Sequence, residues 1–248
     1  FRRVLFRSIV DAAQVDEVQA LITHIDAAAK QRVMKLADID WVTQVQKDFP
    51  PFRLGRFYVY GSYARDTVPT NCLPLLIDAV AAFGTGEHAT TAGCLLALEA
   101  LHKKQKRVRH ALDVVCGTVI LAIGAARLWK SAQILACDND PVAVRVSAEN
   151  LKANQIAGRS KAYVSDGYKA RPIAHAGKQP VIVANILAKP LMKMAKYAAA
   201  QLAPGGTLIL SGLLNSQEPM VLAAHRMQGL YLKSRIRRGK WSILVLGS

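Results

Sequence analysis

Cysteine is scarce in the sequence, and the spacing of the few cysteines excludes two common kinds of site. The four residues are Cys72, Cys94, Cys116 and Cys137, and no two of them form a Cys-x-x-Cys pair. Isolated cysteines of this kind predict neither a structural zinc site nor a disulfide framework. We therefore expect reduced thiols, no bound metal and a cytoplasmic location.

Long apolar runs are also missing. Asn185, Pro204 and several glycines interrupt the apolar stretches well before these reach the length of a bilayer span. No charged-then-apolar targeting segment opens the chain, which starts at Phe1. The sequence therefore predicts a protein that neither spans a membrane nor is exported.

Acidic residues are few: 17 Asp and Glu face 33 Lys and Arg, so the formal net charge is +16. This charge favours attraction to a polyanion, and a merely basic surface is the alternative interpretation. The cluster from Lys103 to Arg109 is equally well explained as a solvated loop. With 248 residues, of which 52% are hydrophobic, the chain is long and apolar enough for one well-buried domain and a small appendage.

Short apolar runs alternate with helical patterns from about residue 75 onward, which is typical of parallel βαβ units. The predicted strands are Ala111–Val115, Gln133–Asp138, Lys161–Val164, Val181–Asn185 and Thr207–Ser211, and the predicted helices are Thr118–Trp129, Pro141–Asn154, Leu191–Leu202 and Gln217–Met227. Two last strands, Leu230–Arg237 and Trp241–Leu246, are joined so tightly that they must be antiparallel. The sequence predicts an α/β fold with a doubly wound, mostly parallel seven-stranded sheet and a C-terminal antiparallel hairpin, similar to the Rossmann-like class I methyltransferases.

The part before residue 75 predicts smaller elements. Ile9 to Leu36 carries apolar residues at helical spacing, which indicates one or two amphipathic helices. A linker helix is expected from Trp41 to the Pro50-Pro51 pair and a short strand from Arg56 to Tyr60, followed by a loop that contains Pro69 and Pro74. We therefore expect three parts, 1–40, 41–74 and 75–248.

A turn and an acid suit a nucleoside-containing cofactor. The strand that ends near Val115 leads through Gly117 into a helix, although Gly117 is all that remains of a Gly-x-Gly-x-Gly pattern, and a plain strand–helix turn explains it about as well. Asp138 ends the next strand, about 20 residues further on, where a carboxylate can accept both ribose hydroxyls, and a second capping acid is the alternative. Asp140, which precedes Pro141, is better explained as a helix N-cap.

Asn185 ends the fourth predicted strand, at a position where a core residue is expected. Its amide carbonyl is suited to accept a hydrogen bond from a substrate amine, and a turn-capping asparagine is the alternative. A loop with Gly84, Gly86 and Thr91 suits the carboxylate of an amino-acid-like ligand. Asp166, after the third strand, is placed either to meet an adenine amino group or to cap its turn.

Five segments in this order and spacing resemble the PrmA family, the ribosomal protein L-11 methyltransferases. They are FGTGEHATT at 83–91, LDVVCGTVILAI at 112–123, the stretch 138–154, ANILAKP at 184–190 and LAPGGTLILSGL at 202–213. The resemblance extends from about Trp41 to Leu246. It implies an enzyme that uses S-adenosylmethionine to methylate lysine and N-terminal amines of a large-subunit ribosomal protein.

Carried over by position, the resemblance places cofactor contacts at Thr91, at the turn from Val115 to Gly117, at Asp138 and at Asn185. It also implies that residues 1–40 are a truncated remnant of an N-terminal substrate-recognition domain. The charge adds contact with ribosomal RNA as a further expectation, and a monomer is expected.

Three valines depart from the family pattern, since Val80, Val115 and Val119 stand where the family has glycines. A side chain at the first position of the turn crowds the methionine part of the cofactor, so we hypothesise a weakened affinity for it. The alternatives are an RNA methyltransferase, which more usually carries an Asn/Asp-Pro-Pro-aromatic segment, and a degenerate binding module. A nicotinamide dehydrogenase fits least, because Gly-x-Gly-x-x-Gly is absent.

Overall fold

The computed structural model describes residues 14–26, 28–31, 33, 50–78 and 89–248, and the chain divides into two compact units, 1–44 and 45–248. In the first unit, helix α1 (Val15–Ile25) confirms the expected amphipathic helix. Its apolar side chains Leu21 and Ile25 are 58% and 76% exposed. The expected linker helix falls almost wholly outside the described residues.

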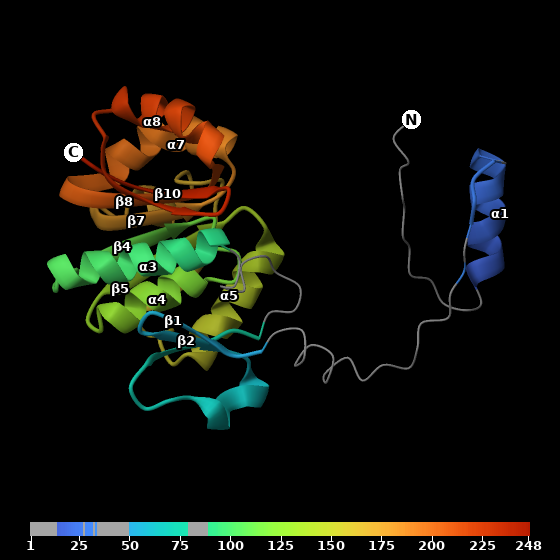
Figure 1. Cartoon of the computed structure of the whole chain (residues 1–248), viewed down its shortest axis with the longest axis horizontal. Helices are drawn as coiled ribbons and strands as arrows, with labels where there is room; N and C mark the ends of the chain where they lie inside the picture. Colours follow the sequence, from blue (N-terminus) through green and yellow to red (C-terminus); the bar gives the residue numbers. More distant parts are fainter. Residues whose placement is uncertain (1–13, 27, 32, 34–49, 79–88) are drawn as a thin grey trace. The chain divides into compact units, whose positions relative to one another are not determined.

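A seven-stranded sheet forms the centre of the second unit, in the order β6-β5-β4-β7-β8-β10-β9 (Figure 1). The parallel strands are β4 (His110–Val114), β5 (Gln133–Asp138), β6 (Ser160–Val164), β7 (Gln179–Asn185) and β8 (Leu202–Leu214). Strand β10 (Trp241–Gly247) pairs antiparallel with β8 and with β9 (Tyr231–Arg238). The predicted mostly parallel sheet with its terminal hairpin is therefore confirmed.

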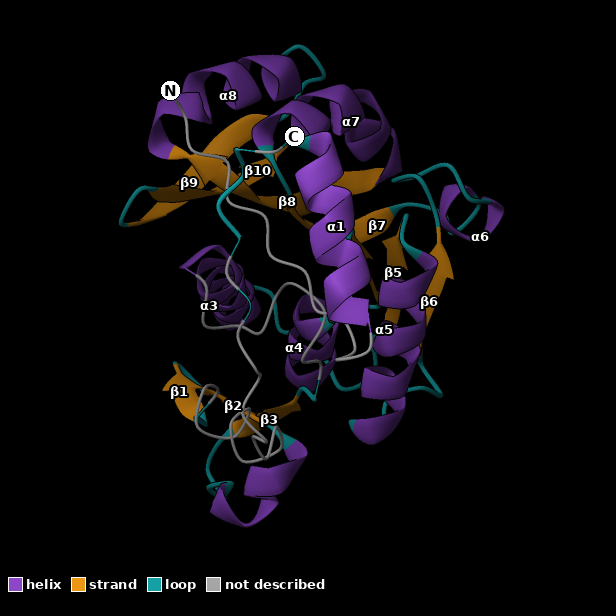
Figure 2. Cartoon of the chain, turned by 90° about the vertical axis from the view of Figure 1, so that its right-hand side faces the viewer, coloured by secondary structure: helices purple, strands orange, loops and turns teal. Residues whose placement is uncertain are grey.

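Helices cover both faces of this sheet (Figure 2). One face carries α3 (Ala89–Lys104), α4 (Ile120–Leu128) and α5 (Pro141–Ala153), and the other carries α6 (Arg171–Ala174), α7 (Ala188–Gln201) and α8 (Glu218–Arg226). The middle of β7 is apolar because both of its faces are buried: Val181 and Val183 pack into the first core, Ile182 and Ala184 into the second. Asp140 caps α5 as predicted, because its carboxylate accepts a hydrogen bond from the N–H of Val142 at 2.8 Å.

A small three-stranded sheet precedes the large one and corrects the expected loop at Pro74. It consists of β1 (Phe52–Leu54), β2 (Phe57–Tyr60) and β3 (Leu73–Leu76), with the 3-10 segment η2 (Ser62–Thr67) between the last two. Pro74 is tolerated in β3 because other residues supply the donors toward β2: the N–H of Leu73 donates to the carbonyl of Arg56, just before β2, and the N–H of Ile77 donates to that of Tyr60. On the other edge, the Asn154 side chain bonds both the N–H and the carbonyl of Leu76, at 3.1 and 2.7 Å.

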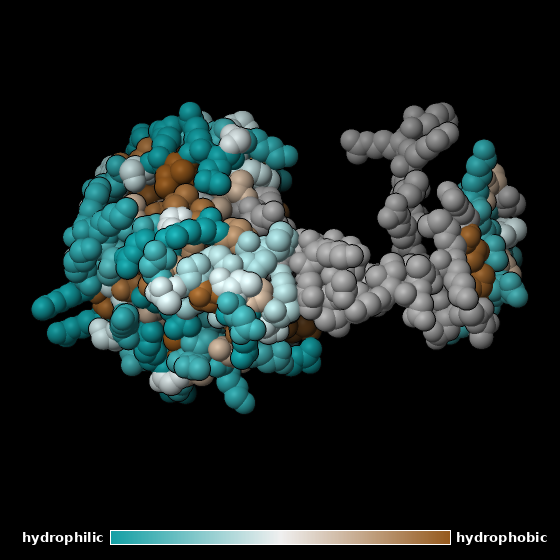
Figure 3. All heavy atoms as spheres, turned by 60° about the horizontal axis from the view of Figure 1, so that its bottom comes forward, coloured by the Kyte–Doolittle hydropathy of each residue, from teal (hydrophilic) through white to brown (hydrophobic). Residues whose placement is uncertain are grey.

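One face of the second unit is largely polar (Figure 3). On the face shown in Figure 3, hydrophilic side chains cover most of this unit, and apolar atoms appear in small separate areas. None of the helices in the described part of the chain combines the length and the apolar composition that a bilayer crossing requires.

Candidate active site

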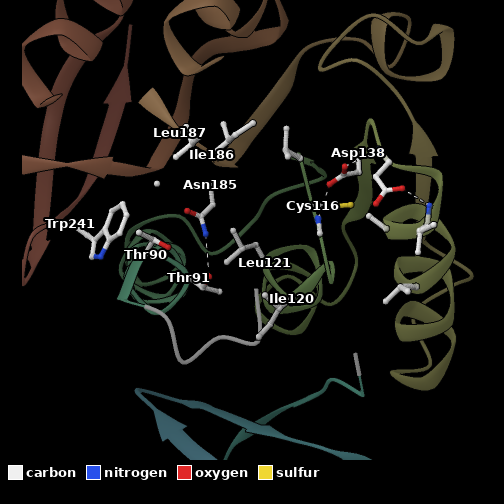
Figure 4. A pocket seen from close by; sticks show the side chains of 17 residues that line it. Thr90, Thr91, Cys116, Ile120, Leu121, Asp138, Asn185, Ile186, Leu187 and Trp241 are labelled. Atoms are coloured by element: carbon white, nitrogen blue, oxygen red, sulfur yellow. Dashed lines mark hydrogen bonds between the residues drawn. The ribbon is translucent and has the colours of Figure 1, made fainter. Parts of the chain in front are cut away.

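A cavity of about 470 Å³ opens at the carboxyl ends of the parallel strands (Figure 4). Strand β4 lies between β5 and β7. The chain builds the sheet outward from β4 through β5 and β6, and then continues on the other side of β4 with β7 and β8. Doubly wound sheets bind their ligands at this reversal of strand order. The cavity is lined by Thr90, Thr91, Val115, Cys116, Gly117, Ile120, Leu121, Asp138, Asp140, Val142, Ala143, Val146, Asn185, Ile186, Leu187, Gly212 and Trp241. Its volume falls in the range of small-molecule and cofactor sites.

The turn after β4 forms one wall of the cavity and has an unusual backbone. Val115, Gly117 and Val119 have φ values of 63°, 53° and 64°, so three alternate residues lie in the left-handed region. This conformation explains the glycine pattern of the family, because glycine adopts it without a steric penalty. A β-branched residue in this region is an outlier that costs on the order of 1–3 kcal/mol.

Helix α5 holds this turn in place through its buried polar side chains. The hydroxyl of Ser147 donates to the carbonyl of Gly117 at 2.9 Å, and the amide of Asn150 donates to the carbonyl of Thr118 at 3.0 Å. These bonds satisfy carbonyl groups that the strained turn leaves without a ladder partner. The two strained valines are thus kept in place by the packing of α5.

Asp113 lies in β4 below the turn and is 1% exposed. Its Oδ2 accepts a hydrogen bond from the N–H of Ala122 at 3.0 Å, which anchors the start of α4, whereas Oδ1 has no hydrogen-bond partner among the described residues. Burial raises the pKa of Asp113 to about 7, against the opposing effect of the Ala122 bond, and the nearby charge of Asp138 adds to the rise. Partial protonation of Asp113 near neutral pH therefore reduces the repulsion between its carboxyl group and that of Asp138.

Asp138 reaches the cavity from the end of β5 and is 5% exposed. Its Oδ2 accepts from the N–H of Gly117 at 2.9 Å, and its Oδ1 accepts from the N–H of Asp140 at 3.1 Å. These two bonds fix the carboxylate, and each oxygen has further lone-pair capacity. A carboxylate held in this way is suited to accept two hydrogen bonds from a vicinal diol such as that of a ribose.

Asn185 and Thr91 meet on the opposite side of the cavity (Figure 4). The Asn185 amide nitrogen donates to the Thr91 hydroxyl oxygen at 3.1 Å, although the two residues are 94 positions apart in the chain. Thr91 is buried at the start of α3, whereas Asn185 is half-buried at the end of β7. Because this bond uses the amide nitrogen, it leaves the carbonyl oxygen Oδ1 available as a hydrogen-bond acceptor.

The structure thus gathers five of the predicted site residues, Thr91, Val115, Gly117, Asp138 and Asn185, around one cavity. Gly84 and Gly86 lie outside the described residues, as does Val80.

Asp166 is not among the residues that line the cavity. Its side chain is 75% exposed and pairs with Lys169 at 2.6 Å, an arrangement that fits the alternative of a turn acid.

Gly212 and Trp241 are two of the twelve lining residues that are not among the predicted site residues. They lie on β8 and β10, whose pairing places Trp241 opposite Leu214 at the same sheet edge as Asn185. A signal for Gly212 was present in the LAPGGTLILSGL segment, because glycine after an apolar strand marks a close backbone approach. Trp241 follows a tight turn in a strand-like run, and only the sheet order brings it to the cavity.

We expect Gly212→Ala to destabilise the protein by roughly 2–4 kcal/mol. The φ of Gly212 is 87°, and a Cβ there would lie 2.5 Å from the backbone oxygen of Ile186, so that either β8 or the segment after Asn185 must move. Urea denaturation measures the change. Gly158→Ala is the matched control, since no atom lies within 4 Å of the Cβ position there, and a similar loss in both variants would contradict the steric explanation.

The sheet order, the terminal hairpin and a cavity with a carboxylate on β5 define a class I methyltransferase. A likeness in fold to the Thermus thermophilus 16S rRNA N2 G1207 methyltransferase in complex with AdoMet and guanosine agrees with this class, with a TM-score of 0.52, 22% identity and coverage of 67% of this chain and 45% of that one.

The chain belongs to the PrmA family. The family model described as "Ribosomal protein L11 methyltransferase (PrmA)" matches residues 3–247. A ribosomal protein L11 methyltransferase from Caulobacter sp. strain K31 is 41% identical over 233 residues, which cover 93% of this chain and 80% of the relative. The crystal structure of a ribosomal protein L11 methylase from Lactobacillus delbrueckii subsp. bulgaricus has a TM-score of 0.70 and 25% identity, and covers 80% of this chain and 98% of that one.

Proposed function

We propose that this enzyme transfers methyl groups from S-adenosylmethionine to amino groups of ribosomal protein L11, on lysine side chains and at the N-terminus. The observation that carries the proposal is the convergence of Thr91, Asp138 and Asn185 on one cavity. Family membership supports both the class of reaction and the acceptor protein.

The residues present fit S-adenosylmethionine. Asp138 offers a fixed carboxylate for the ribose hydroxyls, and Gly117 leaves room for the backbone to approach the ligand. Thr91, at the start of α3, is proposed to hold the methionyl end, while apolar side chains such as Ile120 and Val142 line the wall between. When bound, the cofactor supplies an electrophilic methyl group on a positively charged sulfur.

The chain's own contribution is to present a neutral amine in line with that methyl group. We propose that Asn185 Oδ1 accepts a hydrogen bond from the amine and thereby directs its lone pair, while the bond to Thr91 keeps the amide from rotating. The exposed Leu187 and the indole of Trp241 form an apolar rim, which favours an uncharged amine over an ammonium group.

The test is incorporation of radiolabelled methyl groups from S-adenosylmethionine into isolated ribosomal protein L11, with large-subunit ribosomal RNA as the competing acceptor and the Caulobacter relative as positive control. Label in L11 that acid hydrolysis recovers as methylated lysine supports the proposal. Label that enters only RNA would show an RNA methyltransferase, the alternative that the segment after Asn185 disfavours because it contains Ile186-Leu187 rather than a Pro-Pro pair. Cofactor binding without transfer to either acceptor would show a degenerate binding module.

We further propose that residues 75–248 are the catalytic part, that 41–74 link it to the N-terminal part, and that 1–40 belong to a substrate-recognition domain. Both the acceptor protein and its assembly into ribosomes favour action in the cytoplasm. We propose that the enzyme acts there as a monomer. Contact with ribosomal RNA is a second candidate function, which the distribution of charge favours.

A further inference from the structure

The excess positive charge is concentrated in the last third of the chain. Residues 167–248 contain twelve Lys and Arg and a single acid, Glu218, whereas residues 1–166 contain 21 Lys and Arg and 16 Asp and Glu. Residues 167–248 form β7 to β10 with α6 to α8, and they are named the basic lobe here. The lobe therefore carries +11 of the formal +16.

The single acid of the basic lobe is hidden inside it. Glu218 is 3% exposed, and its carboxylate accepts hydrogen bonds from Arg235, Arg237 and Ser242 at 2.5 to 3.1 Å. The arginine bonds hold the pKa of Glu218 below its usual range, against the effect of burial. Across residues 167–248, all of which the structure describes, no acidic side chain reaches the surface.

The exposed cations follow regular elements. Lys189, Lys193 and Lys196 are four and three residues apart on α7, which places them on one helix face, and α7 packs beside α8 (Figure 1). On β9, Arg235 and Arg237 are two residues apart and both bond Glu218 of α8, so they share one strand face, where side chains repeat about every 6.8 Å. The register with β10 shifts between Ser234 and Leu232, so Lys233 and the 53% exposed Tyr231 lie beyond a bulge and do not continue this alternation.

A cleft of about 380 Å³ lies between α8 and β9, and Arg226, Arg235, Arg237 and Leu222 are among the residues that line it. Glu218 fixes the guanidinium groups of Arg235 and Arg237. Arg235 uses one nitrogen for this and Arg237 uses two, so each group retains further N–H donors. Pinned arginines lose little side-chain entropy when they bind a second anion, and their planar fork matches phosphate.

We propose that the basic lobe binds the sugar–phosphate backbone of single-stranded RNA, with phosphates at the α8–β9 cleft and at the exposed cations of β9 and α7. Tyr231, the exposed first residue of β9, offers an aromatic surface at the end of the strand on which a base can stack, as single-strand binding sites commonly have. Strand β9 ends at Arg238, which pairs with Trp241 of the active-site cavity, so RNA that follows this strand would run toward the place where the acceptor amine enters. Protection of an edge strand by a few cations explains the charges of β9 but not those of α7.

The test is fluorescence anisotropy with a labelled single-stranded RNA of about 20 nucleotides at several salt concentrations. Lys196→Gln, Arg226→Gln and Lys233→Gln are combined, because these exposed side chains come from three elements of the lobe and none of them pairs with Glu218. We expect the affinity to fall at least about tenfold and the slope of log K against log salt to lose about two units. Methylation of isolated L11 should remain unchanged, which separates this proposal from that of the methyl-transfer site.

The matched control removes the same charge outside the lobe, by Lys104→Gln, Lys106→Gln and Arg107→Gln, at positions that are also exposed. Its RNA affinity should stay within about twofold of the unchanged protein. An equal loss in both triple variants would overturn the proposal, because net charge alone would then explain binding. Displacement of RNA by polyglutamate at equal charge would also overturn the proposal. The same holds if anionic phosphatidylglycerol vesicles bind better than RNA and their binding depends on the variants in the same way.

Discussion

Asn185→Ala lowers the kcat of methyl transfer by about two to three orders of magnitude, the range found when one positioned polar group is removed from a reacting centre. The amine then loses the acceptor that directs its lone pair, and the site loses the bond from Asn185 to Thr91. Asp138 and the turn after β4 are untouched, so the Kd for S-adenosylmethionine should change by less than about tenfold. Steady-state kinetics with L11 and isothermal titration with the cofactor measure the two effects separately.

Thr91 supplies the matched variants for this prediction. Thr91→Ser keeps the hydroxyl that accepts from Asn185, and its kcat should stay within a few-fold of the unchanged enzyme. Thr91→Val keeps the shape but removes that acceptor, so its kcat should fall between those of Thr91→Ser and Asn185→Ala. An Asn185→Ala enzyme with an unchanged kcat would show that the amine is oriented by other groups.

Much of this site could be predicted from the sequence, because a doubly wound sheet fixes where strand ends meet. Asp138 and Asn185 each follow an apolar strand, and parallel strands bring their carboxyl ends to the same edge. The cap at Asp140 was equally local, since an acid directly before Pro141 needs only its own helix.

Other features depend on tertiary contacts that no local pattern encodes. Pro74 looks like part of a loop until β2 is known to pair with one edge of β3 and Asn154 with the other. Trp241 enters the site only because β10 inserts between β8 and β9 in the sheet. Arg235 and Arg237 lie in a predicted strand, but their anchoring to Glu218 follows only from the packing of α8 against β9.

The valines of the turn show a difference of another kind. The departure from glycine at Val115 and Val119 suggested a loss of space, whereas the structure shows in addition that both residues adopt a positive φ. Space and backbone strain make different predictions, because a smaller side chain restores the space but only glycine removes the strain.

Val115→Gly should therefore both stabilise the enzyme and tighten its binding of S-adenosylmethionine. Val115 is half-buried at the cavity wall, so its removal relieves a φ of 63° at a modest loss of packing. We expect a gain in unfolding free energy of about 1 kcal/mol and a decrease in the Kd of about tenfold, equivalent to about 1.4 kcal/mol. Urea denaturation and isothermal titration measure the two effects.

Two control variants separate the causes. Val115→Ala enlarges the cavity but keeps the strained backbone, so it should tighten cofactor binding without raising stability. Val119→Gly relieves a nearly identical φ of 64°, but Val119 is 0% exposed in the core, so the void it leaves offsets the relief and the cofactor affinity stays the same. If the unchanged enzyme already binds S-adenosylmethionine as tightly as Val115→Gly does, the valine does not crowd the cofactor and the weakened-affinity hypothesis is wrong.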